Sequence, residues 1–184
     1  MTSTSFALFD TAIGACGIAW SDRGISHAWL PDETASALRR RIGRRLPGAR
    51  EAAPPEPVRG VIDGIVALLA GGSADLSAAV LDLEGVPDFH RRVYALARAI
   101  PGGATLSYGE IARRLGDPSQ ARAVGAALGA NPIPILIPCH RVLAADGRMG
   151  GFSAPGGVRT KLRLLEIEGA RAAAIPTLFS TDPR

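Results

Sequence analysis

Apolar or small residues alternate with polar ones near the start of the chain, a pattern that is typical of β-strands. The alternation covers residues 6–9, 13–20 and 25–30. The turn signals Ile13-Gly14 and Ser21-Asp22-Arg23-Gly24 separate these segments. We therefore expect a β-hairpin or a three-stranded meander at the N-terminus.

A helix is predicted next, because Pro31-Asp32-Glu33 places two acidic side chains where a helix begins. We expect this helix to run to about Leu46 and to carry the arginine-rich residues 39–45. That arginine run is either a solvated helix face or a contact to DNA.

Prolines then interrupt the pattern, and we interpret residues 51–57 as a linker. Residues 58–69 predict a second helix, which ends at Gly71-Gly72. Residues 76–83 are expected to return to the sheet as one more strand.

A domain boundary is expected near Gly85-Val86-Pro87. Beyond it an apolar stripe at helical spacing predicts an amphipathic helix, which Pro101-Gly102-Gly103 closes; the stripe consists of Phe89, Val93, Leu96 and Ile100. The fold class is therefore an α/β N-terminal domain, with a small β-sheet and helices, followed by a mostly helical C-terminal domain.

Two further helices joined by a tight turn are predicted in the C-terminal domain, as in a helix-turn-helix. Ser107-Tyr108-Gly109-Glu110 is a capping box for the first, and Asp117-Pro118 begins the second. The second helix is rich in small residues, and Arg122 is a long cationic side chain near its start. Such a pair either binds DNA or packs a core, because short helix pairs also occur in many proteins that never meet DNA.

Charge is divided unevenly along the chain, whose formal net charge is +4. Residues 1–86 carry 8 basic and 10 acidic side chains, whereas residues 87–184 carry 13 and 7. The second part is thus the better candidate for a polyanionic partner. Lys161 is the only lysine among the basic residues.

The composition, with 47% hydrophobic and 21% charged residues, is that of a globular protein. Its apolar runs fall short of the ~20 residues of a membrane span, and the N-terminus lacks the pattern of a signal peptide. The two cysteines, Cys16 and Cys139, lie in segments of different character, which argues against a disulfide framework. We expect a soluble cytoplasmic protein in which Cys16 is a small buried residue.

The segment around Cys139 is the most informative part of the sequence. Prolines at 132, 134 and 138 forbid a regular helix and a central strand, yet the residues between them are apolar, so we expect a buried extended segment. If Pro138 begins a short helical turn, backbone N–H groups and the adjacent His140 and Arg141 favour the thiolate. The alternative is a structural cysteine beside a solvated His-Arg pair.

Three motifs in this region resemble the O6-alkylguanine-DNA alkyltransferases, the methylated-DNA–protein-cysteine methyltransferases. They are Pro138-Cys139-His140-Arg141-Val142, Asn131-Pro132-Ile133-Pro134 and Ala121-Arg122-Ala123-Val124-Gly125. The resemblance covers most of residues 87–169 and, more loosely, the N-terminal domain.

The resemblance implies a ribonuclease-H-like α/β domain at residues 1–84, a DNA-binding and alkyl-transfer domain at residues 85–172 and a tail at residues 173–184. It implies a single-turnover enzyme that transfers the alkyl group of O6-alkylguanine, and of O4-alkylthymine, irreversibly to Cys139. The partner would be double-stranded DNA, bound through the minor groove with the damaged base flipped out. A monomer without cofactor is expected.

The resemblance also implies residue roles. Cys139 would be the nucleophile, His140 its base through a water, and Glu168 the carboxylate that orients His140. Asn131 would support the active-site turn, and Tyr108 would contact the flipped base and its phosphate. Arg122 would fill the vacated stack; further DNA contacts would come from Ala121, Ala123, Gly125 and Arg141, and the substrate pocket from Val142, Ala145, Phe152 and Ser153.

The chemistry of the residues agrees with these roles. Substitution at a saturated carbon calls for a soft nucleophile such as a thiolate, and a phenol like that of Tyr108 can donate a proton to the leaving guanine. Glu168 ends a helix predicted at residues 158–168, where a carboxylate is unfavourable without a partner such as His140. The alternative for Glu168 is an exposed side chain.

The sequence departs from the family pattern after the cysteine. Phe152 stands where tyrosine is common, and the loop of residues 150–157 looks two residues longer than usual. The zinc site of some relatives is not expected, because the soft ligands besides Cys139 are few: Cys16, His27, His90 and His140.

Two other function classes remain open. A lesion sensor would flip alkylguanine without accepting the group, but the presence of Cys139 argues against it. A cysteine hydrolase would also use Cys and His, but adjacent residues in a rigid turn rarely have that geometry, and no oxyanion motif is apparent.

Overall fold

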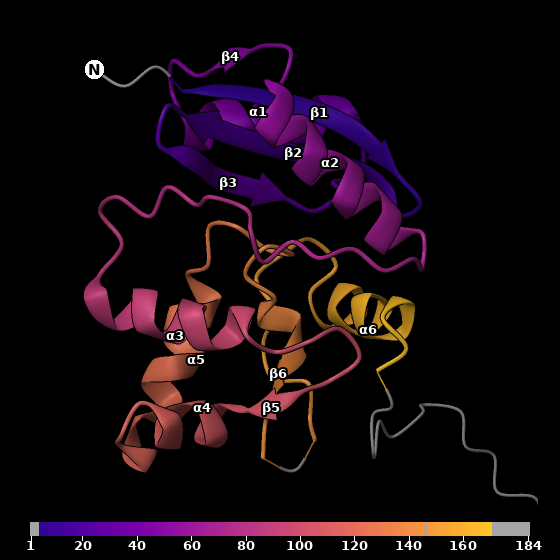
Figure 1. Ribbon diagram of the computed structural model, residues 1–184. Helices are drawn as coiled ribbons and strands as arrows, with labels where there is room; N and C mark the ends of the chain where they lie inside the picture. Colours follow the sequence, from indigo (N-terminus) through magenta and orange to yellow (C-terminus); the bar gives the residue numbers. More distant parts are fainter. Residues whose placement is uncertain (1–3, 146, 171–184) are drawn as a thin grey trace, which may run out of the picture.

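The computed structural model describes residues 4–145 and 147–170, and these form two stacked parts. The N-terminal part is a small sheet with helices, and the C-terminal part below it in Figure 1 is mostly helical. This arrangement confirms the predicted fold class. The expected tail at residues 173–184 lies outside the described residues.

The sheet has four strands in the order β3-β2-β1-β4. The predicted meander is present as the antiparallel strands β1 (Ser5–Thr11), β2 (Gly14–Ser21) and β3 (Gly24–Trp29). The fourth strand is β4 (Arg50–Glu51), which pairs parallel with β1.

Two predictions about the sheet are wrong. Glu51, which we assigned to a linker, belongs to β4, because the chain still runs beside β1 before the prolines begin. Residues 76–83 form no strand but a single bridge from Leu81 to Ile25. The Ile25 backbone donates to Val80 (2.9 Å) and accepts from Asp82 (2.8 Å), which joins this stretch to the sheet edge.

Helices α1 (Ala35–Arg45) and α2 (Glu56–Leu69) pack on different faces of the sheet. The α1 helix begins later than predicted, because Thr34 caps it by accepting a hydrogen bond from the Ala37 N–H. Strand alternation separates the two contact faces. Phe6 and Ala19 pack with Leu38 and Ile42 of α1, whereas Ala7 and Ile18 share a core with Val58, Ile62 and Ile65 of α2.

The C-terminal part begins with α3 (Asp88–Arg98), as predicted. The capping box of Ser107 and Glu110 starts α4, and Asp117 caps the 3-10 turn that leads into α5. A short parallel pair of strands joins the start of α4 to the residues that follow Arg141, with Leu106 opposite Val142 and Ser107 opposite Leu143. The remaining elements are β5 (Leu106–Ser107), α4 (Tyr108–Arg114), η1 (Pro118–Gln120), α5 (Ala121–Gly129), η2 (Cys139–Arg141), β6 (Val142–Leu143) and α6 (Val158–Ile167).

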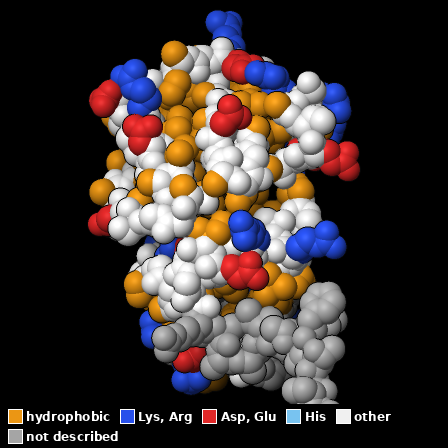
Figure 2. Space-filling model, turned by 90° about the vertical axis from the view of Figure 1, so that its right-hand side faces the viewer, with side chains coloured by type: hydrophobic (Ala, Val, Ile, Leu, Met, Phe, Trp, Pro, Cys, Tyr) orange, Lys and Arg blue, Asp and Glu red, His pale blue; other side chains and the backbone are white. Residues whose placement is uncertain are grey.

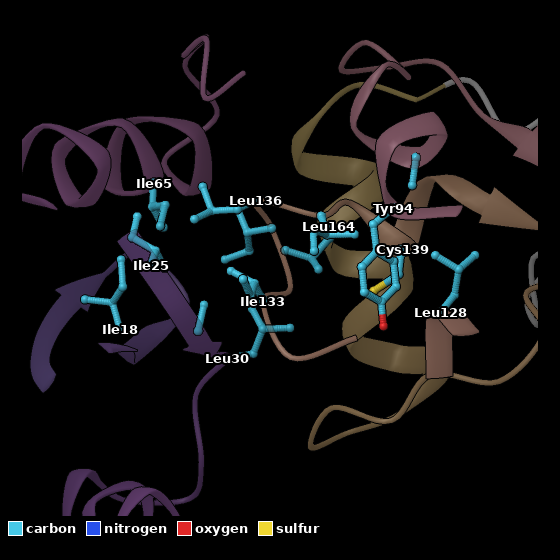
Figure 3. Packing of buried hydrophobic residues seen from close by; sticks show 14 of the residues in the cluster. Ile18, Ile25, Leu30, Ile65, Tyr94, Leu128, Ile133, Leu136, Cys139 and Leu164 are labelled. Atoms are coloured by element: carbon cyan, nitrogen blue, oxygen red, sulfur yellow. The ribbon is translucent and has the colours of Figure 1, made fainter. Parts of the chain in front are cut away.

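The segment before Cys139 is buried between the two parts, and one apolar core runs through both (Figure 3). Ile133 and Ile137 are fully buried, and the Ala28 N–H of β3 donates to Pro132 O at 3.0 Å. We expected this segment to be extended, but it is not extended throughout. It reverses direction at Ile135, whose φ is 76°. This turn, bridged from Pro134 to Ile137, sets the position of Cys139.

The surface has a mixed charge on the face that Figure 2 shows. Acidic and basic side chains are interspersed there, with apolar side chains between them. Among the described residues, none of the helices is both long and apolar enough to cross a membrane.

Candidate active site

Cys139 opens the 3-10 turn η2, directly after Pro138, as the sequence predicts. Its side chain is buried, and its N–H donates to Ile137 O at 2.8 Å. The turn is fixed by the apolar segment beneath it, so the thiol sits on a rigid support.

Asn131 fastens both ends of that segment. Its Nδ2 donates to Ile137 O at 2.8 Å, and its Oδ1 accepts from the Ile133 N–H at 2.9 Å. Burial raises the pKa of Cys139, and the Asn131 side chain partly offsets that rise. Asn131 therefore holds the turn and favours the thiolate as well.

The pKa of the Cys139 thiol is shifted upward, whereas the sequence suggested a downward shift that favours the thiolate. Burial raises the pKa of Cys139, and it outweighs the lowering by Asn131, by the charge of Lys161 and by the N–H groups of Cys139 and His140. The cation that favours the thiolate is thus Lys161, and not the adjacent His140 or Arg141 that we expected. A proton acceptor near the thiol is then needed for reaction at neutral pH.

His140 and Glu168 form a buried pair, as expected. His140 Nε2 lies 3.0 Å from Glu168 Oε1, and both side chains are almost completely buried. Burial lowers the pKa of His140, so its ring is neutral at neutral pH. Its Nδ1 is buried and, within the described part of the chain, has no hydrogen-bond partner.

Glu168 stays ionised in this setting. Burial acts to raise the pKa of Glu168, but hydrogen bonds from His140 and Arg141 outweigh it and lower the pKa to about 2. Glu168 is the C-cap of α6, where the helix dipole alone disfavours a carboxylate. Its two partners account for that placement.

Arg141 is a partner of Glu168, and the structure does not support the predicted DNA contact. Its Nε and Nη2 donate to the two carboxylate oxygens at 2.9 and 2.7 Å, and its Nη1 donates to Ile100 O at 2.5 Å. The residue is only 9% exposed. The correction has a physical reason: the guanidinium is held by three hydrogen bonds within the protein, and little of the side chain is left exposed to meet a phosphate.

A cavity of about 630 Å³ opens beside Cys139. Arg122 and Gly125 of α5 line it, together with Tyr108 at the start of α4 and Phe152 and Ser153 of the loop before α6. These residues were all predicted from the sequence for DNA or substrate. The wall also includes Ala121 and, from the loop of residues 150–157 that was expected to wall the alkyl pocket, Gly150 and Gly151. Leu128 and Gly129 also line it and were missed.

Two residues assigned to the substrate pocket do not line it. Val142 is fully buried in β6, where it pairs with Leu106, and Ala145 is exposed in the loop that follows. Both assignments are corrected, because the chain turns away from the cavity once η2 ends. Ala123, predicted as a DNA contact, is exposed on α5.

Tyr108 projects into the cavity against the backbone of Gly150. A Cβ at Gly150 would lie 2.7 Å from the phenol oxygen, and its φ of 60° also favours glycine. Burial, together with the charge of Cys139, raises the pKa of Tyr108. The phenol is therefore protonated at neutral pH and can donate a hydrogen bond in the cavity.

Lys161 is a member of the site that our sequence reasoning did not identify. It is fully buried, and its Nζ donates to Val142 O at 2.6 Å and to Met149 O at 2.5 Å. Burial lowers its pKa to about 8, and Nζ lies 5.8 Å from the centroid of the Tyr108 ring. A lone lysine at helical spacing from Leu164 and Leu165, in a chain rich in arginine, was the available signal.

The described residues contain no group of three or more side chains suited to hold a metal ion. Cys16 is a free, buried thiol beside Thr11, and burial raises its pKa to about 11. It lies in β2 within the apolar core, which agrees with the interpretation of Cys16 as a small buried residue.

Comparison with known proteins gives a consistent result. The family model "6-O-methylguanine DNA methyltransferase, DNA binding domain" matches residues 88–170. A methylated-DNA–protein-cysteine methyltransferase of Methanothermobacter thermautotrophicus is 37% identical over 153 residues, covering 83% of this chain and 78% of the relative. One from Mycobacterium tuberculosis is 46% identical over 125 residues, covering 68% and 73%.

Solved structures agree with the sequence relatives. A crystal structure of Mycobacterium tuberculosis OGT in complex with DNA superposes with a TM-score of 0.73 at 35% identity, covering 92% of this chain and 96% of that one. A methyltransferase from Pyrococcus kodakaraensis gives a TM-score of 0.66 at 26% identity, covering 90% and 99%.

Proposed function

Because this chain belongs to the methylated-DNA–protein-cysteine methyltransferase family, whose members repair O6-methylguanine in DNA, we propose that Cys139 irreversibly accepts the alkyl group. The observation that carries the proposal is the position of the thiol. Cys139 forms part of the cavity wall beside Tyr108 and Arg122, and it is followed directly by the buried His140–Glu168 pair.

The thiol loses its proton first. Neutral His140 takes it through a water at Nδ1, the ring nitrogen that has no protein partner among the described residues. Glu168, ionised and bound at Nε2, stabilises the imidazolium that forms. The adjacent charge of Lys161 stabilises the thiolate.

Transfer then occurs in a single displacement. The thiolate sulfur forms a bond to the alkyl carbon as the bond from that carbon to O6 breaks, and the electron pair stays with guanine. Tyr108 transfers its phenolic proton to the leaving base, which departs as neutral guanine. The phenolate of Tyr108 regains a proton from water, and the imidazolium of His140 returns to water the proton that it took from the thiol. Every group in this scheme belongs to the chain or to the DNA, so no cofactor is required.

We assign the approach to DNA to α5. Arg122 and Ala123 are exposed on this helix, and Ala121 and Gly125 are small residues near the cavity. Such a face can approach the narrow minor groove, where Arg122 would fill the stack left by the flipped base. The same pocket would take O4-alkylthymine, which also presents an alkylated oxygen on its ring.

The protein would act as a monomer on double-stranded DNA, and its two free thiols suit a reducing cytoplasm.

The deciding experiment is incubation with duplex DNA that carries radiolabelled O6-methylguanine, followed by mass spectrometry. Label on Cys139 and its absence from a Cys139→Ser variant support transfer. Retention of the label on tightly bound DNA indicates a lesion sensor, and turnover of an ester or peptide indicates a cysteine hydrolase.

A further inference from the structure

A second cavity, of about 290 Å³, also reaches Cys139 and extends from it toward the N-terminal domain. It shares Gly129, Phe152 and Ser153 with the first cavity, as well as the cysteine itself. Ser153 Oγ donates to Gly129 O at 3.0 Å, so the shared walls are tied together. The thiol is thus reached from two cavities, of which only the first is used in the proposed repair of a methyl group.

The far wall of this second cavity combines apolar surface with cations. Trp29 and Leu30 of the N-terminal domain face Pro134 and Pro155 of the C-terminal domain across it. Pro155 belongs to the loop of residues 150–157, which precedes α6. A volume near the lower end of ligand pockets suits a group of one ring.

Two nitrogen atoms of the wall lack partners. Arg41 Nε and His27 Nδ1 are both buried without a hydrogen bond among the described residues. The other two nitrogens of the Arg41 guanidinium are engaged: Nη2 donates to Leu30 O at 2.7 Å, and Nη1 lies 3.5 Å from Asp32 Oδ2. Arg45 also lines the cavity. Burial, with the charge of Arg45 adding to it, lowers the pKa of His27 to about 4, so His27 is neutral at neutral pH. Because Asp32 offsets the charge of Arg41, the positive charge of the wall that is not balanced by a carboxylate comes from Arg45.

We propose that this second cavity receives the distal part of long O6 substituents and selects those that end in a carboxylate. The inference rests on the proposed function, because the substituent must first reach Cys139 on guanine. As the sulfur–carbon bond forms and the carbon–O6 bond breaks, the substituent stays on the sulfur and guanine leaves with the electron pair and a proton. The acidic end then meets the Arg41 Nε donor and the charge of Arg45.

The test uses free-base substrates, which remove DNA binding from the measurement. O6-(4-carboxybenzyl)guanine and O6-(4-aminomethylbenzyl)guanine have the same ring and opposite end charges. We expect Arg45→Gln to lower the ratio of their transfer rates by about 5-fold, as for charges that are partly exposed to solvent. Intact-protein mass spectrometry gives each rate and confirms one adduct on Cys139.

Arg40→Gln is the matched control, because Arg40 is another exposed arginine of α1 and is not part of the cavity wall. It removes the same charge and should leave the ratio unchanged. An equal effect of both variants, or none, would overturn the proposal, as would failure of wild type to accept either benzyl substrate while it repairs O6-methylguanine in DNA. Failure on O6-methylguanine as well would instead contradict the proposed function.

Discussion

One oxygen of Glu168 accepts hydrogen bonds from both residues that follow the cysteine. Oε1 lies 3.0 Å from His140 Nε2 and 2.7 Å from Arg141 Nη2, while Oε2 accepts from Arg141 Nε. Arg141 therefore fixes the carboxylate that in turn orients the base. The proton path of the proposed mechanism depends on this contact more than on any feature of the cysteine alone.

Glu168→Gln should cut the single-turnover transfer rate ~10- to ~1000-fold, the usual range for a general acid–base group. The imidazolium loses its counter-charge, so the apparent pKa of Cys139 rises and the rate profile moves to higher pH. Glu166→Gln is the control, because Glu166 is exposed and paired only with Arg163 in the described structure. A larger loss of transfer rate in the Glu166 variant would show that we have assigned the proton relay to the wrong carboxylate.

The same carboxylate predicts how stability depends on pH. The pKa of Glu168 falls from 4.5 to about 2 on folding, so its contribution is complete above pH 4.5 and is lost as the pH drops toward 2. Thermal unfolding midpoints measured across this window should fall less steeply for Glu168→Gln than for wild type. Parallel curves would show that Glu168 titrates normally in the folded protein.

Lys161→Met tests the buried cation. The change keeps most of the side-chain volume but removes the charge that favours the thiolate and the two bonds to Val142 O and Met149 O. We expect a transfer rate at pH 7 that is roughly 10-fold lower and recovers at higher pH, where the thiolate forms without help. Arg163→Met, on the same helix, should show neither effect, and an unchanged pH profile in the Lys161 variant would refute the assignment.

Among the elements, α5 is the one whose role can be separated from bond making. Arg122→Ala should slow repair of O6-methylguanine in duplex DNA strongly and leave reaction with free O6-benzylguanine unchanged, because the free base needs no flipping. The Arg122 side chain is exposed, and among the described residues it has no hydrogen bond to the Cys139 thiol. Single-turnover rates on both substrates decide, and equal losses would show that Arg122 acts in the chemistry.

Local signals predicted the elements that carry the site. The Ser107–Glu110 box and the Asp117 cap are determined within four residues of sequence. The α4 helix begins at its box, whereas the Asp117 cap begins the 3-10 turn η1, and α5 follows only at Ala121. Pro138 likewise predicted the turn at Cys139. The turn at Ile135 could not be foreseen, because its positive φ is imposed by packing between the two parts of the molecule and not by a glycine.

The features that the sequence did not predict depend on contacts between residues that are far apart along the chain. The pairing of β4 with β1, the Arg141–Ile100 bond and the burial of Lys161 join segments that no periodicity relates. The DNA contact of Arg141 was inferred from the family resemblance, and the structure buries this residue although arginine is usually exposed. Its burial follows from Glu168, which the sequence places near His140 only through the family resemblance.

The whole molecule is built around the segment that ends at Cys139. Ile133 and Leu136 join the sheet and its helix to the C-terminal helices in one core, so the cysteine rests on both parts at once (Figure 3). A group added to the sulfur therefore enters a cavity whose walls are held by the entire fold. The other free cysteine of the described residues, Cys16, is buried in β2 of the N-terminal sheet.

This placement predicts the stoichiometry of repair. The thioether formed on Cys139 has no good leaving group, and the proposed mechanism offers no nucleophile to remove it, so one protein molecule should repair one lesion. A titration of O6-methylguanine duplex with increasing protein should give a repaired fraction that rises linearly and ends at equal amounts. Each repaired lesion should correspond to one methyl group on Cys139 by mass spectrometry. Repaired DNA in excess of protein would contradict this scheme, because it would require a route that regenerates the thiol.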